Sequence, residues 1–391
     1  MEPTMVSCSF PDEIMMNILS HLPIKSLVRF RCVCKSWFRL FTGQNSDPYF
    51  SQLHDAQLTL ANPDPILIDL YNNDEHQSPS TFRFASDYTQ IDNPIEIKEP
   101  DCCTDESDKY VWVNGICNGL VCFENWESDS NTMYIWNPVT RESIVIPSPP
   151  YLSDNSIKRN KRAVYGFGFC QATNEYKVVG VIVSSLGSAT DKYDYQCHAN
   201  VLTLGTNTWR IMQDVLSDVH TRHWKSCSVI VNGVHHWLSE RKSTFRKILI
   251  SLDLEHEILQ EIPLPNNLEN HYIRVEELSG MLAIVYEEYK KGVQIWVMND
   301  YGDHNSWRKQ FTITQSQIPV QNRILEPFGI ANDGNIMMRN WDVLLLFNPK
   351  TNSITSRNFF CSGDSLRSTY FYKWSLVSPR YITVLDSITE N

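Results

Sequence analysis

One sequence feature constrains the fold more than any other: a unit of about 50 residues recurs from residue 111 onward. Each unit holds a tight hairpin and then two strands joined by a polar turn, all rich in Val, Ile, Tyr, Trp and Thr. Matching turns at Gly205, Asp253, Asn299 and Asn348 are 48, 46 and 49 residues apart. Asn-Gly and Asp-Gly pairs in the hairpins supply the positive φ that two-residue turns need. Four-stranded repeats of this length indicate a β-propeller.

The hairpins and the returning strand pairs alternate along the chain. We expect the hairpins at 115–123, 172–183, 228–238, 276–286 and 329–339, and the strand pairs at 134–147, 201–212, 249–265, 295–311 and 344–359. Strand-like runs at 57–60, 66–71 and 81–84, closed by a C-terminal strand around 372–385, would complete one more sheet and remove exposed edges. The prediction is a kelch-like β-propeller of six blades, with a two-sheet β-sandwich as the alternative.

In the first 50 residues the apolar side chains are spaced as in an α-helix instead. Pro11 suits a first helical turn, and Pro23 ends the same helix. Between them one face carries an apolar stripe made of Ile14, Ile18, Leu19 and Leu22. Two further helical segments follow, from Ser26 and around Trp37. Because so short a segment buries too little surface to be stable alone, another protein or the large domain should cover part of the stripe.

The helical pattern and the β-strand pattern divide the chain into regions. We expect an N-terminal tail at 1–9, a helical module at 10–50, a connecting region with the first β blade at 51–110 and the remaining propeller at 111–391. The predicted fold class is therefore mainly β with a small N-terminal α module, in which three helices precede the propeller.

The helical module resembles the plant F-box. The family pattern is matched by Pro11, Glu13, Ile14, Ile18, Leu19, Leu22, Pro23, Lys25, Ser26, Leu27, Arg29, Phe30, Arg31, Cys32, Val33, Cys34, Lys35, Ser36 and Trp37. Phe10 replaces the usual Leu, which leaves an apolar residue before the proline. The resemblance implies a substrate-recognition subunit of an SCF-type (Skp-cullin-F-box) ubiquitin ligase, without catalytic residues or cofactor. It also implies that Phe30 and Trp37 hold the module together, and that the Skp-type adaptor is contacted by Phe10, Pro11, Ile14, Ile18, Leu19, Leu22, Pro23 and Leu27.

The large domain resembles the plant F-box-associated domain across 111–380. The resemblance rests on CNGL (117–120), WNPVTR (136–141), GFGF (166–169), NEYKVV (174–179), NGVHHWL (232–238), IWVM (295–298), SWRK (306–309) and SLVS (375–378). This broad group includes S-locus F-box proteins, which recognise basic ribonucleases. A receptor for basic ribonucleases and a propeller scaffold without ligase coupling are therefore the alternatives to a general ligase subunit.

The charge distribution limits the kinds of partner. The net charge is −11, and the first 50 residues contribute +1, so the remainder carries −12. Such a domain repels phosphate backbones over about 8 Å at physiological salt, which argues against nucleic-acid binding and favours a basic protein substrate. The basic residues of the helical module fit a solvated face better than a DNA-reading helix: Lys25, Arg29, Arg31, Lys35 and Arg39.

Two further features indicate the compartment. No stretch reaches the roughly 18 apolar residues of a membrane span, and the N-terminus lacks the unbroken apolar core of a signal peptide. The 11 cysteines are scattered and form no CxxC pair. We therefore expect reduced thiols, a cytoplasmic or nuclear location and no membrane contact.

Catalytic and metal-binding readings find little support. Gly166-x-Gly168 lacks the third glycine and the following helix of a dinucleotide site. The adjacent His235 and His236 should point to opposite faces of a strand, and His220 with His223 lacks a nearby Cys or acid. We expect no metal. The recurring tryptophans are assigned to packing between blades: Trp112, Trp136, Trp209, Trp237, Trp296 and Trp307.

The order of strands predicts where a substrate binds. The tight turns should share one rim of the propeller, and the longer connections should share the other. The longer connections are expected at 124–132, 184–198, 239–247 and 287–292 within blades and at 148–162, 213–226, 266–272, 314–326 and 360–369 between blades. Aromatic and charged residues in these loops are the candidate substrate contacts: Tyr151, Lys158, Arg159, Lys161, Arg162, Tyr193, Tyr195, His223, Trp224, Arg241 and Lys242.

Overall fold

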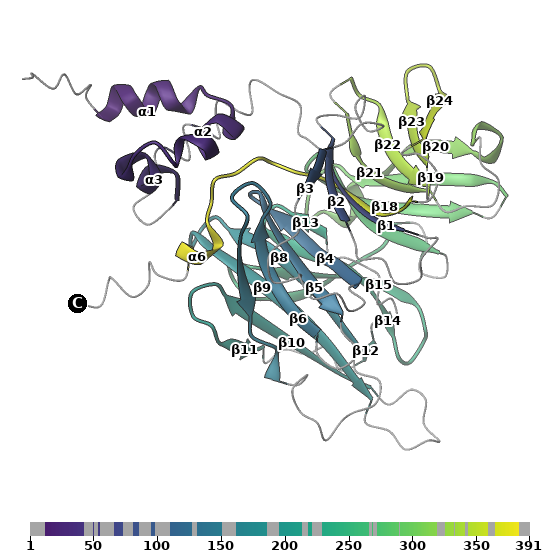
Figure 1. Cartoon of the computed structure of the whole chain (residues 1–391). Helices are drawn as coiled ribbons and strands as arrows, with labels where there is room; N and C mark the ends of the chain where they lie inside the picture. Colours follow the sequence, from purple (N-terminus) through teal and green to yellow (C-terminus); the bar gives the residue numbers. More distant parts are fainter. Residues whose placement is uncertain are drawn as a thin grey trace, which may run out of the picture.

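In the part of the chain that the structure describes, three short helices, α1 to α3, precede a domain made mostly of β-strands (Figure 1). The structure is a computed structural model that describes residues 12–42, 50, 54, 66–72, 81–85, 95–97, 110–126, 131–150, 162–185, 195–212, 218–220, 229–265, 268, 272–288, 290–318, 325–331, 333–340, 343–358 and 364–382. The predicted class, mainly β with an N-terminal α module, is confirmed. The helices are α1 (Asp12–Ser20), α2 (Ile24–Phe30), α3 (Lys35–Thr42) and the C-terminal α6 (Pro379–Ile382), with single 3-10 turns at His304–Ser306 and Gln315–Gln317.

The helical module has a small core of its own. Its fully buried side chains are Leu19, Leu27, Phe41 and Phe50. Helix α1 ends at Ser20, and Pro23 lies directly before α2 with φ −56°. The rings of Phe30 and Trp37 lie 5.3 Å apart and pack against this core. The structure therefore agrees with the predicted role of these two aromatic residues.

The strands of the described part of the chain form six separate sheets, and five of these use consecutive strands. Their strands are β4 (Tyr110–Cys117), β5 (Leu120–Trp126), β6 (Asn131–Asn137) and β7 (Glu142–Ile146); β8 (Arg162–Cys170), β9 (Glu175–Ser185), β10 (Tyr195–Thr203) and β11 (Trp209–Ile211); β12 (Val219–His220), β13 (Val229–Val231), β14 (Val234–Arg241), β15 (Lys247–Asp253) and β16 (Leu259–Ile262); β17 (Ile273–Leu278), β18 (Met281–Glu288), β19 (Gly292–Met298) and β20 (Trp307–Thr314); and β21 (Glu326–Ile330), β22 (Ile336–Asn340), β23 (Val343–Asn348) and β24 (Ser353–Asn358). The propeller prediction is confirmed, and the two-sheet sandwich is not formed.

The sixth sheet joins the two ends of the β domain. It contains β1 (Ile66–Asn72), β2 (Thr81–Ala85), β3 (Ile95–Ile97) and, from the far end of the chain, β25 (Asp364–Phe371). The strand β25 pairs antiparallel with β1, with a register shift between Asp69 and Leu70. One strand from each sheet contacts its equivalent in the next sheet: β4 contacts β8, β8 contacts β13, β13 contacts β17, β17 contacts β21, and β21 contacts β25. These six strands line one ring. Tyr370 of β25 donates a hydrogen bond to the Val113 carbonyl of β4 at 3.5 Å and completes the ring.

Three details of this sheet and its neighbours differ from the prediction. The closing strand is 364–371 and not 372–385, because its alternating Ser, Arg and Thr side chains hide the apolar period of a strand that is defined by pairing with β1. Strand β3 and the short β12, which pairs with the end of β14, were not expected. The expected strand at 57–60 lies outside the described residues.

Tryptophans join neighbouring sheets in a repeated way. The indole of Trp209, at the start of β11, donates to the Pro147 carbonyl just after β7, at 2.6 Å. In the same manner Trp307, at the start of β20, donates to the Pro263 carbonyl just after β16, at 3.0 Å. Trp136 is fully buried. These contacts support the assignment of tryptophans to packing between blades.

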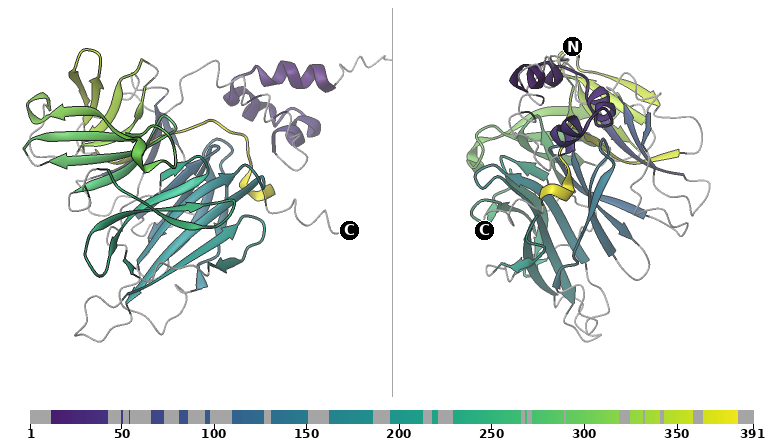
Figure 2. Two further views of the ribbon diagram at one scale, coloured as in Figure 1. Left: turned by 180° about the vertical axis from the view of Figure 1, so that it is seen from behind. Right: turned by 60° about the vertical axis from the view of Figure 1, so that its left-hand side comes forward.

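The chain after β25 leaves the propeller and returns to the helical module. Residues 372–378 are extended and lead into α6, which packs on β6 and β7. Figures 1 and 2 show this yellow segment passing between the propeller and the three purple helices. We call residues 372–382 the strap.

The ring closure generates a stability prediction. Gly329 of β21 faces the ring of Phe371 at the end of β25, and an added Cβ would overlap that ring. Gly329→Ala should therefore lower the unfolding free energy by about 1 to 3 kcal/mol, measured by urea denaturation. The added substitution Phe371→Leu should reduce this penalty, because the two positions share one space. An unchanged unfolding free energy in Gly329→Ala would contradict the described closure.

Candidate functional site

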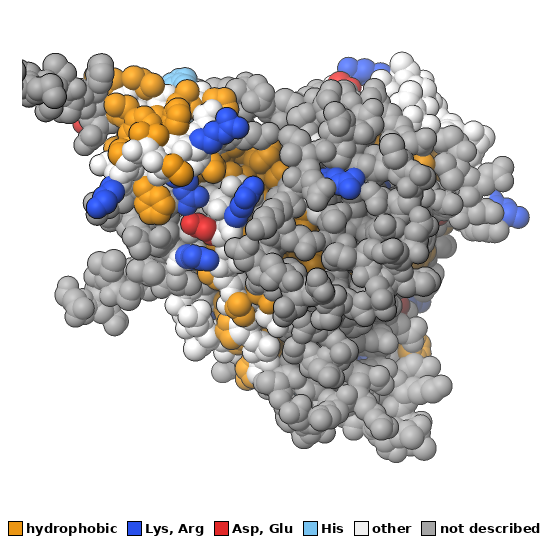
Figure 3. Space-filling model, viewed as in Figure 1, with side chains coloured by type: hydrophobic (Ala, Val, Ile, Leu, Met, Phe, Trp, Pro, Cys, Tyr) orange, Lys and Arg blue, Asp and Glu red, His pale blue; other side chains and the backbone are white. Residues whose placement is uncertain are grey.

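An exposed apolar surface lies on the helical module. Ile14 and Ile18, one turn apart on α1, are 48% and 52% exposed, and Val33 and Phe38 are exposed as well. Figure 3 shows hydrophobic side chains gathered over this module. These side chains lie outside the buried core of the module. They form the candidate contact surface for a partner protein.

The structure separates the predicted adaptor contacts into two groups. Ile14, Ile18 and Pro23 are exposed, and Leu22 is half-buried. Leu19 and Leu27 are 2% and 0% exposed, so their prediction as contact residues is corrected. Leu19 of α1 and Leu27 of α2 both point into the core of the module, and the stripe of α1 is wide enough to serve both that core and the surface.

Two predicted contacts, Phe10 and Pro11, lie outside the described residues. Sequence reasoning missed the exposure of Val33 and Phe38. Phe38 follows the half-buried Trp37 on α3, about 100° further around the helix, and the apolar pattern alone does not tell which of the two faces the core.

The helical module is attached to the propeller by specific contacts. Arg31 Nη2 lies 3.0 Å from Glu142 Oε1 of β7, and the two side chains are only 11% and 18% exposed. Leu376 of the strap packs against the core of the module. These contacts place the module at the rim that carries the β4–β5 and β6–β7 turns, which we call the tight-turn rim.

The opposite rim carries the candidate substrate contacts. Arg162 opens β8, Tyr195 opens β10, and both pair with the last residues of β9, at the end opposite the 171–174 turn. We call this end the long-loop rim. The other candidates in the loops lie outside the described residues: Tyr151, Lys158, Arg159, Lys161, Tyr193, His223 and Trp224.

Arg241 and Lys242 are candidates whose surroundings are described, and the Lys242 backbone N–H donates to the Asp218 carbonyl at 2.9 Å. The Arg241 guanidinium lies 3.8 Å from Asp218 Oδ2 and also contacts Glu261. Hydrogen bonds from Ser243 and the nearby Arg241 and Lys242 lower the pKa of Asp218. Because two carboxylates already compensate Arg241, its positive charge is less available to a partner than the sequence suggested.

Four connections of the long-loop rim are shorter than expected. Between β5 and β6 only 127–130 connect the strands, and between β24 and β25 only 359–363 do. Between β14 and β15 the turn occupies 242–246, where Phe245 has φ +57°. Between β18 and β19 only 289–291 connect the strands. The predicted long connections at 124–132, 239–247, 287–292 and 360–369 are therefore wrong, since the strands themselves extend into these ranges.

The histidine pair is part of the protein interior. His235 is fully buried and burial lowers its pKa to about 3, while burial lowers that of His236 to about 4. His236 Nε2 is 2.9 Å from the Tyr301 hydroxyl. Among the described residues, no group of three His, Cys, Asp or Glu could hold a metal ion.

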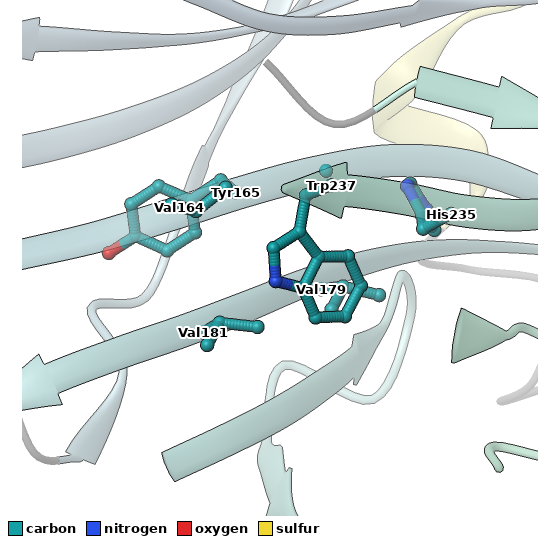
Figure 4. A pocket seen from close by; sticks show the side chains of 7 residues that line it. Val164, Tyr165, Val179, Val181, His235 and Trp237 are labelled. Carbon is teal, nitrogen blue, oxygen red and sulfur yellow. The ribbon is translucent and has the colours of Figure 1, made fainter. Parts of the chain in front are cut away.

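A crevice beside His235 does not provide a ligand site. It is lined by Val164, Tyr165, Gly166, Val179, Val181, His235 and Trp237, and it is too narrow for a water molecule (Figure 4). Trp237 packs with Val179 and Val181 in one core cluster. The crevice is therefore a seam between two sheets.

Taken together, the geometry defines an interaction protein, in which a helical module with exposed apolar side chains is attached to a rigid propeller. Known sequences agree. The sequence model of the F-box domain matches residues 7–49, and that of the F-box associated beta propeller domain matches residues 69–373. The chain belongs to the family of F-box proteins that carry an F-box associated β-propeller domain. Neither matched model describes an enzyme family.

Similar full-length proteins come from Arabidopsis thaliana. F-box protein At3g07870 is 30% identical over 338 residues, which cover 78% of this chain and 72% of that protein. F-box/kelch-repeat protein At3g23880 is 25% identical over 392 residues, covering 95% and 96%. F-box protein CPR1 is 23% identical over 343 residues, covering 83% and 78%.

No helix within the described ranges is both long enough and apolar enough to cross a bilayer.

A buried acid in the propeller generates a prediction about pH. Burial, partly offset by the Asn114 side chain, raises the pKa of Glu124 in β5 to about 7. The folded state then holds the proton more tightly than the unfolded state, so the unfolding free energy should fall as pH rises from about 4.5 to about 7. Glu124→Gln should remove the part of this dependence that Glu124 contributes and add about 2 to 3 kcal/mol at pH 8. The part from Glu276, whose pKa burial also raises to about 7, should remain. Urea denaturation between pH 4.5 and 8 measures both; identical pH profiles for the two proteins would refute the assignment.

Proposed function

We propose that this protein is the substrate-recognition subunit of an SCF-type ubiquitin ligase. The observation that carries the proposal is the exposed pair Ile14 and Ile18 on a module that has its own core. An apolar surface of this kind on an F-box domain suits a Skp-type adaptor, and through the adaptor a cullin scaffold. The proposed contacts are Ile14, Ile18, Leu22, Pro23, Val33 and Phe38, together with Phe10 and Pro11.

The substrate is proposed to bind at the long-loop rim. This rim is opposite the one that holds the helical module, so a bound substrate and a bound adaptor do not compete for surface. The charge of −12 outside the first 50 residues supports a basic protein as substrate and a role without nucleic acid. We propose ubiquitination and degradation of this substrate in the cytoplasm or nucleus.

The adaptor contact can be tested by one charge substitution. Ile18→Arg should weaken adaptor binding about 100-fold, because an apolar contact would be replaced by a buried, unpaired charge worth roughly 3 kcal/mol. The module should stay folded, since Ile18 is already 52% exposed. Isothermal titration of the full chain with a Skp-type adaptor measures the change. Ile211→Arg on β11, where Ile211 is 51% exposed, is the matched control and should bind normally. Equal affinity of both variants would sink the proposed adaptor surface.

The substrate rim is tested by exchanging loops. Replacing 151–161, 186–194 and 221–228 with the loops of a related F-box protein should change which proteins are recovered from proteasome-inhibited cells. Adaptor binding should be unchanged, because the exchange leaves the sequence of the helical module as it is. Exchange of the 299–306 and 349–352 turns serves as the control. If the turn exchange changes the recovered proteins and the loop exchange does not, the rims have been assigned the wrong way round.

A further inference from the structure

Three sequence landmarks that lie far apart in the chain meet at one place. They are the CNGL turn (117–120), the WNPVTR turn (136–141) and the SLVS segment (375–378). The first two join neighbouring strands of one sheet, and the third belongs to the strap. Their meeting point lies on the tight-turn rim, beside the helical module.

Asn137 makes the central contact. This side chain is fully buried, and its Nδ2 donates hydrogen bonds to the carbonyls of Ser375 and Val377, at 3.0 and 2.7 Å. Its Oδ1 accepts from the backbone N–H groups of Val139 and Thr140, at 2.8 and 3.2 Å. One side chain thus closes its own turn and holds the strap by two buried hydrogen bonds.

The neighbouring turn fits closely under the strap. Gly119 has φ +74°, and an added Cβ would overlap Ser375 and lie 2.6 Å from the Lys373 carbonyl oxygen. The Gly119 carbonyl accepts a buried hydrogen bond from the Tyr372 hydroxyl at 2.7 Å. The strap therefore lies on the backbone of this turn without room for any side chain.

Beyond this point the strap reaches the helical module. Leu376 packs against the module core, whereas Val377 and Ile382 pack into the core between the β4–β7 and β8–β11 sheets. The Arg31–Glu142 ion pair joins the module to the same β4–β7 sheet. The strap is thus bonded to the propeller on one side and to the module on the other.

We infer that the strap is a latch that fixes the orientation of the helical module on the propeller, and that Asn137 and Gly119 are the positioning residues that hold it. The consequence for ubiquitin transfer rests on the proposed function. A fixed orientation keeps the adaptor surface at a constant distance from the long-loop rim, and a released latch would leave both binding surfaces intact but no longer aligned.

Comparison with equivalent turns elsewhere in the propeller shows which contacts of the Asn137 amide are specific to the strap. Asn348 caps its turn in the same way, with Oδ1 accepting from the N–H groups of Lys350 and Thr351. Among the described residues it makes only these turn contacts. Asp253 caps a third such turn through a carboxylate oxygen. Because Asp serves this turn equally well, Asn137→Asp should keep the turn and lose only the two bonds to the strap, with a carboxylate facing two carbonyl oxygens.

The first experiment compares Asn137→Asp with Asn348→Asp in the full chain. Fluorophores on unnatural side chains at positions 35 and 350, on α3 and on the β23–β24 turn, report the distance between module and propeller by single-molecule energy transfer. The unmodified chain and Asn348→Asp should give one narrow distance distribution. Asn137→Asp should broaden it, and amide hydrogen exchange in 373–378 should become at least about tenfold faster.

A second matched pair tests the same latch through packing. Gly119→Ala and Gly280→Ala both place alanine at positive φ, +74° and +80°, but only the first adds a clash with the strap, since nothing lies within 4 Å at Gly280. Both should show similar loss of hairpin stability. Only Gly119→Ala should broaden the distance distribution.

The distance distributions test the latch, and the adaptor affinity tests the proposed function separately. A narrow distribution in both Asn137→Asp and Gly119→Ala would overturn the latch. If the distribution broadens, the adaptor affinity should stay within about twofold, because Ile14 and Ile18 are not in the contact. A chain with a working latch that binds no Skp-type adaptor would overturn the proposed function and leave the latch in place.

Discussion

The pairing of β25 with β1 is the contact on which the rest of the architecture depends. It joins strands that are almost 300 residues apart and turns a row of sheets into a closed ring. Closure removes the two edges that an open row would expose, and it joins the ends of a long loop at an entropic cost that the other contacts of the propeller must offset. It also determines where the C-terminus emerges. Since β25 ends at the tight-turn rim, the strap begins beside the helical module.

Buried polar groups make the contacts between sheets specific. Lys177 at the start of β9 is almost fully buried, and its Nζ donates to the Leu254 carbonyl at 2.7 Å and contacts Glu257 at 3.0 Å in the next sheet. Near the β17 and β21 strands, Arg274 lies 3.2 Å from Glu326, which also contacts Arg339. An unpaired charge at either place would be costly, so a shifted register between neighbouring sheets is disfavoured. The propeller is therefore suited to hold two surfaces at a constant separation.

The sequence was most informative where a local rule acts alone. The turn pairs Asn118–Gly119 and Asn232–Gly233 do adopt positive φ, and the repeat spacing located the five sheets of consecutive strands. It was least informative where burial depends on a distant segment. No local pattern distinguishes Leu19, which is buried, from Ile18 beside it, which is exposed. The strap was mistaken for a strand because its apolar residues are buried by the β4–β7 sheet and the helical module rather than by a neighbouring strand.

Asn137 illustrates why a shared motif need not mean a shared role. The Asn-Pro-x-Thr pattern recurs at Asn348, and in both places the oxygen of the amide closes the turn. Only at Asn137 does the nitrogen of the amide meet a second segment, and that segment comes from the far end of the chain. A turn motif that is sufficient for a hairpin has therefore acquired a second use at the one sheet that faces the helical module. The ring by itself fixes only the propeller, so the helical module is placed by this added contact together with the Arg31–Glu142 ion pair.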